Sequence, residues 1–150
     1  MPSEFRTTRR VEFADTDMAG IAHFANFFRW MEEVEHEFFR SLGHSVHAAA
    51  HGGAFGFVRA HASCDYARPA RYEDVLDVRL RVEKKTAKAL HYRFEFGAPA
   101  PAGQAKAPEA APPLAVGRLE VVCVTRDAPD GPLRSTEIPA SIADQLQAAP

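Results

Sequence analysis

In this chain one amphipathic segment is followed by four segments of alternating polarity, and few folds accommodate that order. Across residues 24–41, apolar residues recur at intervals of three and four, which predicts a helix with one continuous apolar stripe. Aromatic residues also lie beside the stripe, so we expect the helix to be covered on more than one side by a sheet or a partner chain. The stripe consists of Phe27, Met31, Val34, Phe38 and Leu42.

The four segments after the helix are predicted strands, because apolar and polar residues alternate along them. A further strand within 4–14 precedes the helix and ends on the alternation of Val11 and Phe13. Strands in series without crossover helices pair antiparallel. The order β-α-β-β-β-β therefore predicts an α+β fold with a five-stranded antiparallel sheet. The strands after the helix cover about 54–66, 74–83, 90–96 and 114–126.

Three local patterns add detail to this prediction. Between the last two strands, twelve of the sixteen residues in 98–113 are Ala or Pro, so we expect a hairpin extension that carries no chemistry. A turn or short helix is expected from about 139. In the first strand after the helix, the alternation assigns one face to Val58, Ala60, Ala62, Cys64 and Tyr66.

Length and composition indicate one globular domain covering residues 1–150, because half that length would hold a poor core. Apolar residues make up 46% of the chain, and the formal net charge of −2 gives no sign of a nucleic-acid or membrane-surface protein. The two cysteines, Cys64 and Cys123, are expected to be reduced thiols of a core. No apolar run resembles a signal peptide or a membrane span, so we expect a soluble, cytoplasmic protein.

Asp15 and Asp17 follow the first strand and lie a few residues before the predicted helix. The start of a helix offers unpaired N–H groups that polarise a carbonyl oxygen, and a nearby carboxylate can attack that carbonyl or deprotonate a water. Gly20 lets the connecting backbone turn close to a ligand. From these residues alone a second interpretation stays open, in which both aspartates only bind N–H groups of the turn.

The segment VEFADTDMAGIAHFANFFRWMEEVEHEFFRSLG, residues 11–43, resembles the opening of the 4-hydroxybenzoyl-CoA thioesterase branch of the hot-dog superfamily. The likeness lies in the strand, the D-x-D-x-x-G turn and the aromatic-rich helix start. The segments 64–78 and 123–142 are also similar to that family. The family fold is a long helix wrapped by an antiparallel sheet. Its members are dimers or dimers of dimers whose site lies at the subunit interface.

The resemblance implies that this chain is an acyl-CoA thioesterase, with acyl-CoA as its substrate and a homodimer or homotetramer as its assembly. Asp17 corresponds to the catalytic carboxylate, the backbone N–H of Phe24 to the group that activates the thioester carbonyl, and Asp15 to a residue that stabilises the turn. Coenzyme A is part of the substrate, so no separate cofactor is implied. The residues expected to contact substrate here are Gly20, Ile21, His23 and Asn26.

Two of these assignments have alternatives. For His23 a packing role is the favoured alternative, and the run Ile21-Ala22-His23-Phe24 departs from relatives that carry His after the glycine or paired Asn at the helix start. Lys84, Lys85 and Lys88 form a cationic group that could bind coenzyme A phosphates, or a solvated turn. In the second case, Arg68 and Arg71 are the next candidates for the phosphates.

Two functions other than hydrolysis also fit this fold. A hot-dog hydratase or dehydratase would use a pair such as Asp17 and His23, whose spacing does not match the hydratase pattern. A non-catalytic acyl-CoA-binding protein would have no use for Asp17. The seven histidines are too scattered for metal-ligand spacing, and no G-x-S-x-G segment supports a serine hydrolase, so we expect neither kind of site.

Overall fold

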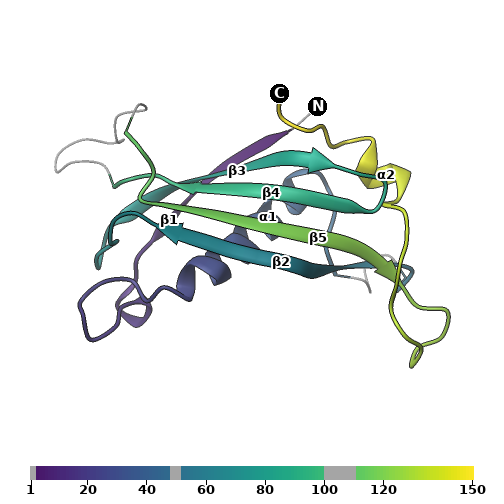
Figure 1. Ribbon diagram of the computed structural model, residues 1–150, viewed down its shortest axis with the longest axis horizontal. Coiled ribbons are helices and arrows are strands. Elements are labelled where there is room, and N and C mark those ends of the chain that lie inside the picture. Colours follow the sequence, from purple (N-terminus) through teal and green to yellow (C-terminus); the bar gives the residue numbers. More distant parts are fainter. Residues whose placement is uncertain (1–2, 48–51, 100–110) are drawn as a thin grey trace.

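The computed structural model describes residues 3–47, 52–99 and 111–150. Its strands are all antiparallel and lie in the order β1-β3-β4-β5-β2, while helix α1 crosses one face of the sheet (Figure 1). The predicted α+β fold is confirmed, with a two-residue strand β6 added beside β5. The elements are β1 (Glu4–Arg10), a 3-10 turn (Phe13–Asp15), α1 (Asn26–Ser41), β2 (Gly56–Tyr66), β3 (Val75–Lys85), β4 (Ala89–Phe96), β5 (Ala115–Thr125), β6 (Arg134–Ser135) and α2 (Ala140–Ala143).

Helix α1 forms the centre of the core, as its apolar stripe predicts. Trp30 and Phe39, which lie beside the stripe, are buried as well, so the sheet covers more than one side of the helix. The helix approaches β5 so closely that a Cβ atom on Gly117 would lie 2.1 Å from the Met31 sulfur. A side chain at that point of β5 would therefore have to displace the end of the Met31 side chain.

The predicted first strand is too long at its C-terminal end. Val11 is buried as expected, but its N–H and carbonyl bind Asp74 and Glu73 in the loop before β3. The chain then turns, since the Asp15 N–H donates to the Glu12 carbonyl, and Phe13 lies exposed in the 3-10 turn instead of in the sheet. The alternation of Val11 and Phe13 was wrong as a strand signal because the turn follows within two residues.

A β-bulge in β2 overturns half of the face predicted for that strand. The register with β5 shifts between Arg59 and His61, which leaves Ala60 as the extra residue. After the bulge, Ala62, Cys64 and Tyr66 stand opposite Leu119, Gly117 and Ala115, so this half of the prediction is confirmed. Before it, Phe57 and Arg59 stand opposite the buried Cys123 and Val121, whereas Val58 faces outward.

The remaining strand predictions hold. Strands β3, β4 and β5 alternate buried and more exposed residues along most of their length, and α2 lies where a short helix was expected. The Ala/Pro-rich segment connects the neighbouring strands β4 and β5, but its residues 100–110 lie outside the described residues. The described part of the chain has no helix with the length and apolar character needed to cross a membrane.

The bulge gives the core one ionisable pair. Glu35 of α1 is 1% exposed, and the inward-facing Arg59 places a guanidinium nitrogen 2.8 Å from Glu35 Oε1. That contact lies outside hydrogen-bond angles, and among the described residues neither Glu35 oxygen has a well-aligned donor. Burial, only partly offset by Arg59, raises the pKa of Glu35 from 4.5 to about 7.

Replacing this carboxyl should change how stability depends on pH. The folded state keeps the Glu35 proton to a higher pH than the unfolded chain does, so Glu35 contributes most stability below about 4.5 and loses it as the pH rises to about 7. We expect Glu35→Gln to be more stable than the parent at pH 8, with a flatter profile between those pH values. Urea unfolding across pH 4.5–8 measures this. Glu83→Gln, an exposed change on β3, should leave the profile unaltered, and an unaltered profile for Glu35→Gln would contradict the assignment.

Candidate functional site

Asp15 fastens the turn before α1 to the start of the helix. Its buried carboxylate accepts the Glu12 N–H at 2.9 Å and is ion-paired with Arg29. Its backbone carbonyl accepts the His23 N–H at 2.8 Å and the Asn26 side-chain amide at 2.7 Å. All of these contacts lie within the turn and the first helical residues. They agree with a structural role for Asp15, and they give Asn26 a structural contact where a substrate contact was expected.

Asp17 lies on the tight turn that Asp15 holds. The turn closes through bonds from the Gly20 N–H to the Asp17 carbonyl and from the Asp17 N–H to the Ile21 carbonyl, both at 3.0 Å. Gly20 has a φ of +76°, a conformation that favours glycine and explains why the turn needs that residue. The half-buried Asp17 carboxylate accepts one hydrogen bond, from the Ala19 N–H at 2.8 Å. Its remaining acceptor positions are available to a ligand.

Phe24 precedes α1, which begins at Asn26 instead of at residue 24 as predicted. Its carbonyl accepts the Phe27 N–H at 3.3 Å in the first turn of the helix. Within the described residues no acceptor is bound to the Phe24 N–H. This donor lies where the helix dipole favours negative charge, so it can stabilise an oxygen that gains charge.

Asp17 and Phe24 line the same pocket, which has a volume of about 450 Å³. Its other walls come from the turn, from the first turn of α1 and from the chain that follows β2. The lining is mostly apolar, with Asp17 and Arg68 as its charged members. The complete lining is Asp17, Ile21, Ala22, Phe24, Phe27, Tyr66, Ala67, Arg68, Pro69 and Ala70.

The remaining predicted contacts divide between this pocket and other places. Ile21 lines the pocket, while Gly20 lines a neighbouring pocket on the other side of Asp17, beside Phe13 and Tyr72. The His23 ring packs against the Phe24 ring, with centroids 4.6 Å apart, and its Nδ1 accepts the Ala25 N–H. These contacts support the interpretation of His23 as a packing residue.

The three lysines do not lie with Asp17 in this chain. They occupy the turn between β3 and β4, whereas Asp17 lies near the other ends of these strands, about 25 Å away by the length of β4. Lys85 donates to the carbonyls of Ala143 and Leu146, both at 2.7 Å, and so holds the C-terminal segment. Within one chain the lysines therefore lie apart from Asp17, and their contact with coenzyme A stays a prediction.

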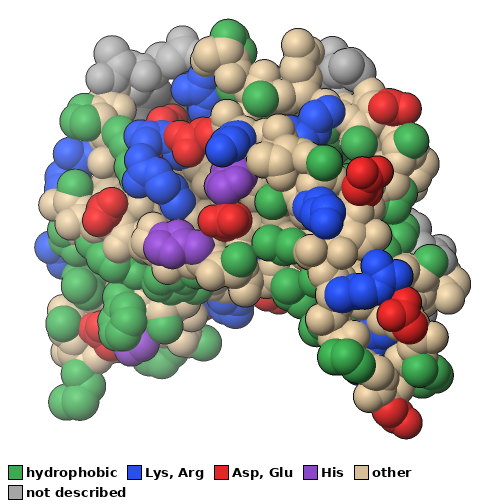
Figure 2. All heavy atoms as spheres, turned by 45° about the vertical axis from the view of Figure 1, so that its right-hand side comes forward, with side chains coloured by type: hydrophobic (Ala, Val, Ile, Leu, Met, Phe, Trp, Pro, Cys, Tyr) green, Lys and Arg blue, Asp and Glu red, His purple; other side chains and the backbone are tan. Residues whose placement is uncertain are grey.

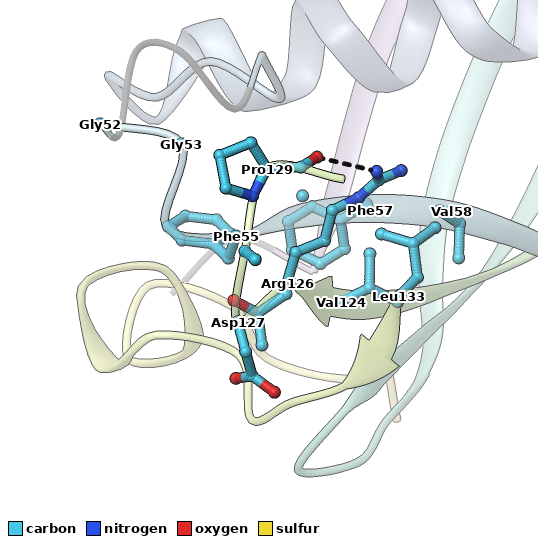
Figure 3. A pocket seen from close by; sticks show the side chains of 13 residues that line it. Gly52, Gly53, Phe55, Phe57, Val58, Val124, Arg126, Asp127, Pro129 and Leu133 are labelled. Carbon is cyan, nitrogen blue, oxygen red and sulfur yellow. Dashed lines mark hydrogen bonds between the residues drawn. The ribbon is translucent and has the colours of Figure 1, made fainter. Parts of the chain in front are cut away.

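A second pocket, of about 660 Å³, escaped the sequence analysis (Figure 3). It lies where β2 begins and β5 ends, and Phe55, Phe57, Val58 and Leu133 supply apolar walls. Arg126 crosses it and donates to the Pro129 carbonyl at 3.3 Å. These residues come from three separate segments, and no spacing in any one of them signals a pocket.

Strand β2 is the open edge of the sheet and separates the two pockets. Within the described residues it pairs only with β5, and its eleven residues are mostly exposed. The Asp17 turn lies beside one end of β2 and the loop after β5 beside the other (Figure 1). Figure 2 shows a hollow between two projecting parts of the surface, and exposed apolar side chains lie on the left-hand projection. Among the described residues, no three His, Cys, Asp or Glu side chains are grouped as ligands of a metal ion.

This combination of fold and pocket has known counterparts. Residues 11–146 match the family model of the thioesterase-like superfamily. The chain belongs to this superfamily. The resemblance seen in residues 11–43 is thereby confirmed, and the family match extends it over nearly the whole chain.

Three proteins illustrate the similarity. A protein of Aquifex aeolicus (strain VF5) presumed to be an esterase is 40% identical over 84 residues, 56% of this chain and 63% of that protein. The chain thus spans slightly less than two thirds of that relative. A 1,4-dihydroxy-2-naphthoyl-CoA hydrolase of Prochlorococcus marinus (strain MIT 9313) is 32% identical over 103 residues, 63% of this chain and 68% of that protein. The solved 4-hydroxybenzoyl CoA thioesterase from Pseudomonas sp. strain CBS-3 shares the fold, with a TM-score of 0.80, 21% identity and coverage of 95% and 99% of the two chains.

The contacts of Asp15 predict a loss of stability when its charge is removed. In Asp15→Asn, one side-chain oxygen can still accept the Glu12 N–H, but the ion pair with the half-exposed Arg29 is lost. We expect the free energy of unfolding to fall by about 1–3 kcal/mol. Guanidinium unfolding measures the change. Asp127→Asn, which breaks an exposed ion pair with Arg134, is the control and should lower stability less than Asp15→Asn does. Equal stability of Asp15→Asn and the parent would rule out the anchoring role.

Proposed function

We propose that this protein is an acyl-CoA thioesterase that hydrolyses an acyl-CoA to a carboxylic acid and free coenzyme A. The observation that carries the proposal is the shared pocket of the Asp17 carboxylate and the unbound Phe24 N–H. A thioester carbonyl placed between them would meet a base or nucleophile on one side and a donor for its oxygen on the other. Membership in the thioesterase-like superfamily supports the same reaction.

The proposed reaction follows from what each group can do. As a general base, Asp17 takes a proton from a water, whose oxygen bonds to the thioester carbon while the Phe24 N–H stabilises the charge on the carbonyl oxygen. The C–S bond then breaks and the coenzyme A sulfur takes up a proton. As a nucleophile, Asp17 itself bonds to the carbonyl carbon, coenzyme A leaves, and water hydrolyses the resulting anhydride.

We further propose an aromatic acyl group as the preferred substrate. Phe24, Phe27 and Tyr66 supply aromatic walls to the pocket beside Asp17. Two of the similar proteins are named for aromatic thioesters, 1,4-dihydroxy-2-naphthoyl-CoA and 4-hydroxybenzoyl-CoA. A hydrolysis assay with these two substrates and hexanoyl-CoA, using a thiol-detecting reagent, compares the acyl classes. Hydration of an enoyl-CoA without thiol release would favour the hydratase alternative instead.

We also propose that each site is built from two copies of the chain, joined by antiparallel pairing of their β2 edges. A long open edge is normally covered, and a two-fold axis across β2 would do so with identical surfaces. Antiparallel pairing sets the end of β2 in one protomer beside the start of β2 in the other. The Asp17 pocket would then lie next to the partner's pocket around Leu133.

The same pairing offers a position for two of the lysines. It would bring the β3–β4 turn of one protomer to the end of the assembly where the Asp17 of the other lies. Lys84 and Lys88 are exposed on that turn, whereas Lys85 is engaged with the C-terminal segment. We propose Lys84 and Lys88 as contacts of the coenzyme A phosphates across the interface.

Substitution of the carboxylate tests the proposed reaction. Asp17→Asn keeps the size of the side chain and an oxygen for the Ala19 N–H, but it removes the base or nucleophile. We expect kcat to fall by about 10²–10⁴, with little change in KM or melting temperature. Asp77→Asn, the same substitution on β3 away from the proposed interface, should retain full turnover. Near-normal turnover by folded Asp17→Asn would remove Asp17 from the reaction.

Sedimentation of two matched variants tests the proposed interface. Val58 lies on the open edge strand and Val75 at the start of β3, and both are exposed. We expect the parent to sediment as a dimer or tetramer at micromolar concentration. Val58→Lys should raise the dimer dissociation constant at least about tenfold, because like charges would meet across the edge, whereas Val75→Lys should not. A monomeric parent would contradict the shared site.

A further inference from the structure

A side-chain hydrogen bond from Tyr66 connects the sheet to the candidate donor residue, Phe24. Tyr66 is the last residue of β2, and its hydroxyl donates to the Phe24 carbonyl at 2.9 Å. The two residues are 42 positions apart in the sequence, so this bond joins the edge strand to the turn before α1. Neither the spacing nor the polarity of the sequence predicts it.

The Tyr66 ring is held firmly enough to direct its hydroxyl. It packs edge-on against Phe27, with ring centroids 5.2 Å apart and planes at 83°. Phe27 in turn packs against Trp30 and Phe96, both at 5.0 Å, in the buried core. Burial raises the pKa of the Tyr66 phenol, so it stays protonated and able to donate at all pH values used for assays.

With this bond, the peptide groups on both sides of Phe24 are held by hydrogen bonds. On the N-terminal side, the His23 N–H donates to the Asp15 carbonyl and the His23 carbonyl accepts the Asn26 N–H. On the C-terminal side, the Phe24 carbonyl accepts the Phe27 N–H at 3.3 Å, and the Tyr66 hydroxyl makes the shorter contact. Fixing both adjoining peptide groups fixes the direction of the Phe24 N–H.

We propose that Tyr66 is a positioning residue for thioester hydrolysis, which acts through the Phe24 carbonyl to aim the Phe24 N–H at the substrate oxygen. This inference rests on the proposed function, because it needs the Phe24 N–H to serve the reaction. A preorganised donor contributes only if it is held in place before the charge develops. Tyr66 is the last residue of the edge strand β2. Pairing of that edge with a second copy would therefore also affect the position of the Phe24 N–H.

Three variants separate the effect of the Tyr66 hydroxyl from the effect of its ring and from the effect of removing a tyrosine hydroxyl elsewhere in the sheet. Tyr66→Phe removes only the hydroxyl, and Tyr66→Leu removes the ring as well. Tyr92→Phe is the matched control, because Tyr92 is buried in the middle of β4, where its hydroxyl interacts with Glu35, and it does not line the Asp17 pocket. We expect Tyr66→Phe to lower kcat about 10- to 100-fold, the effect of a slightly misplaced group, with KM changed less than about twofold. Tyr92→Phe should leave kcat unchanged.

Two further readouts distinguish positioning from a merely structural role. The acid limb of the profile of kcat/KM against pH should stay in place for Tyr66→Phe, because the Asp17 carboxylate accepts its hydrogen bond from the Ala19 N–H and not from Tyr66. In amide NMR spectra, the Phe24 resonance should shift while that of Val34, in the middle of α1, should not. Melting temperature shows that the variant is folded, as expected for a side chain that is 45% exposed in the parent.

Each outcome decides between the claims. Unchanged kcat in Tyr66→Phe, or an equal loss in Tyr66→Phe and Tyr92→Phe, would overturn the positioning role while Asp17→Asn still tests the reaction. A loss in Tyr66→Leu alone would show that ring packing is what matters, and would also overturn it. Full turnover by Asp17→Asn would instead refute the proposed function, whatever Tyr66→Phe does.

Discussion

Close packing of α1 on β5 sets the position of everything that surrounds the Asp17 pocket. Gly117 leaves space for the Met31 sulfur beside the backbone of the strand, and a side chain there would displace the end of Met31. Phe27 lies one helical turn before Met31 and joins the aromatic cluster with Trp30 and Phe96. The helix start is thus fixed against the sheet, and the turn that carries Asp17 is fixed in turn through Asp15. A mobile helix could not hold a donor and a carboxylate in one pocket.

The buried Glu35 connects the same helix to the edge strand β2. One turn beyond Met31, the core accepts a carboxyl group, which the bulge in β2 supplies with Arg59 as its partner. Removal of Arg59 would leave the buried carboxyl group without its partner, so the pair links the helix to the edge strand. The edge strand is therefore linked to the middle of α1 through Arg59 and Glu35. Its last residue, Tyr66, is bonded to Phe24, just before the start of α1.

Patterns within single segments predicted the elements, and contacts between segments account for what was missed. The stripe of α1 and the alternation in β3 to β5 follow from burial on one face, so they are visible in the sequence. The bulge at Ala60 and the turn at Phe13 depend on backbone bonds to other strands. The Asp17 turn was found through its family resemblance, but the Tyr66 contact and the pocket at Leu133 join residues distant in sequence.

The shared site is the central claim, and mixing two inactive variants tests it most directly. Asp17→Asn removes the carboxylate, and Leu133→Glu places a charge in the exposed apolar pocket that we assign to the partner. Each homodimer should be inactive, but in a mixed dimer one site would have an intact half from each chain. After joint refolding at equal amounts, half of the dimers should be mixed, and one of the two sites in each mixed dimer should be intact. We therefore predict about one quarter of parental activity. No recovery of activity in a sample that contains mixed dimers would contradict the account.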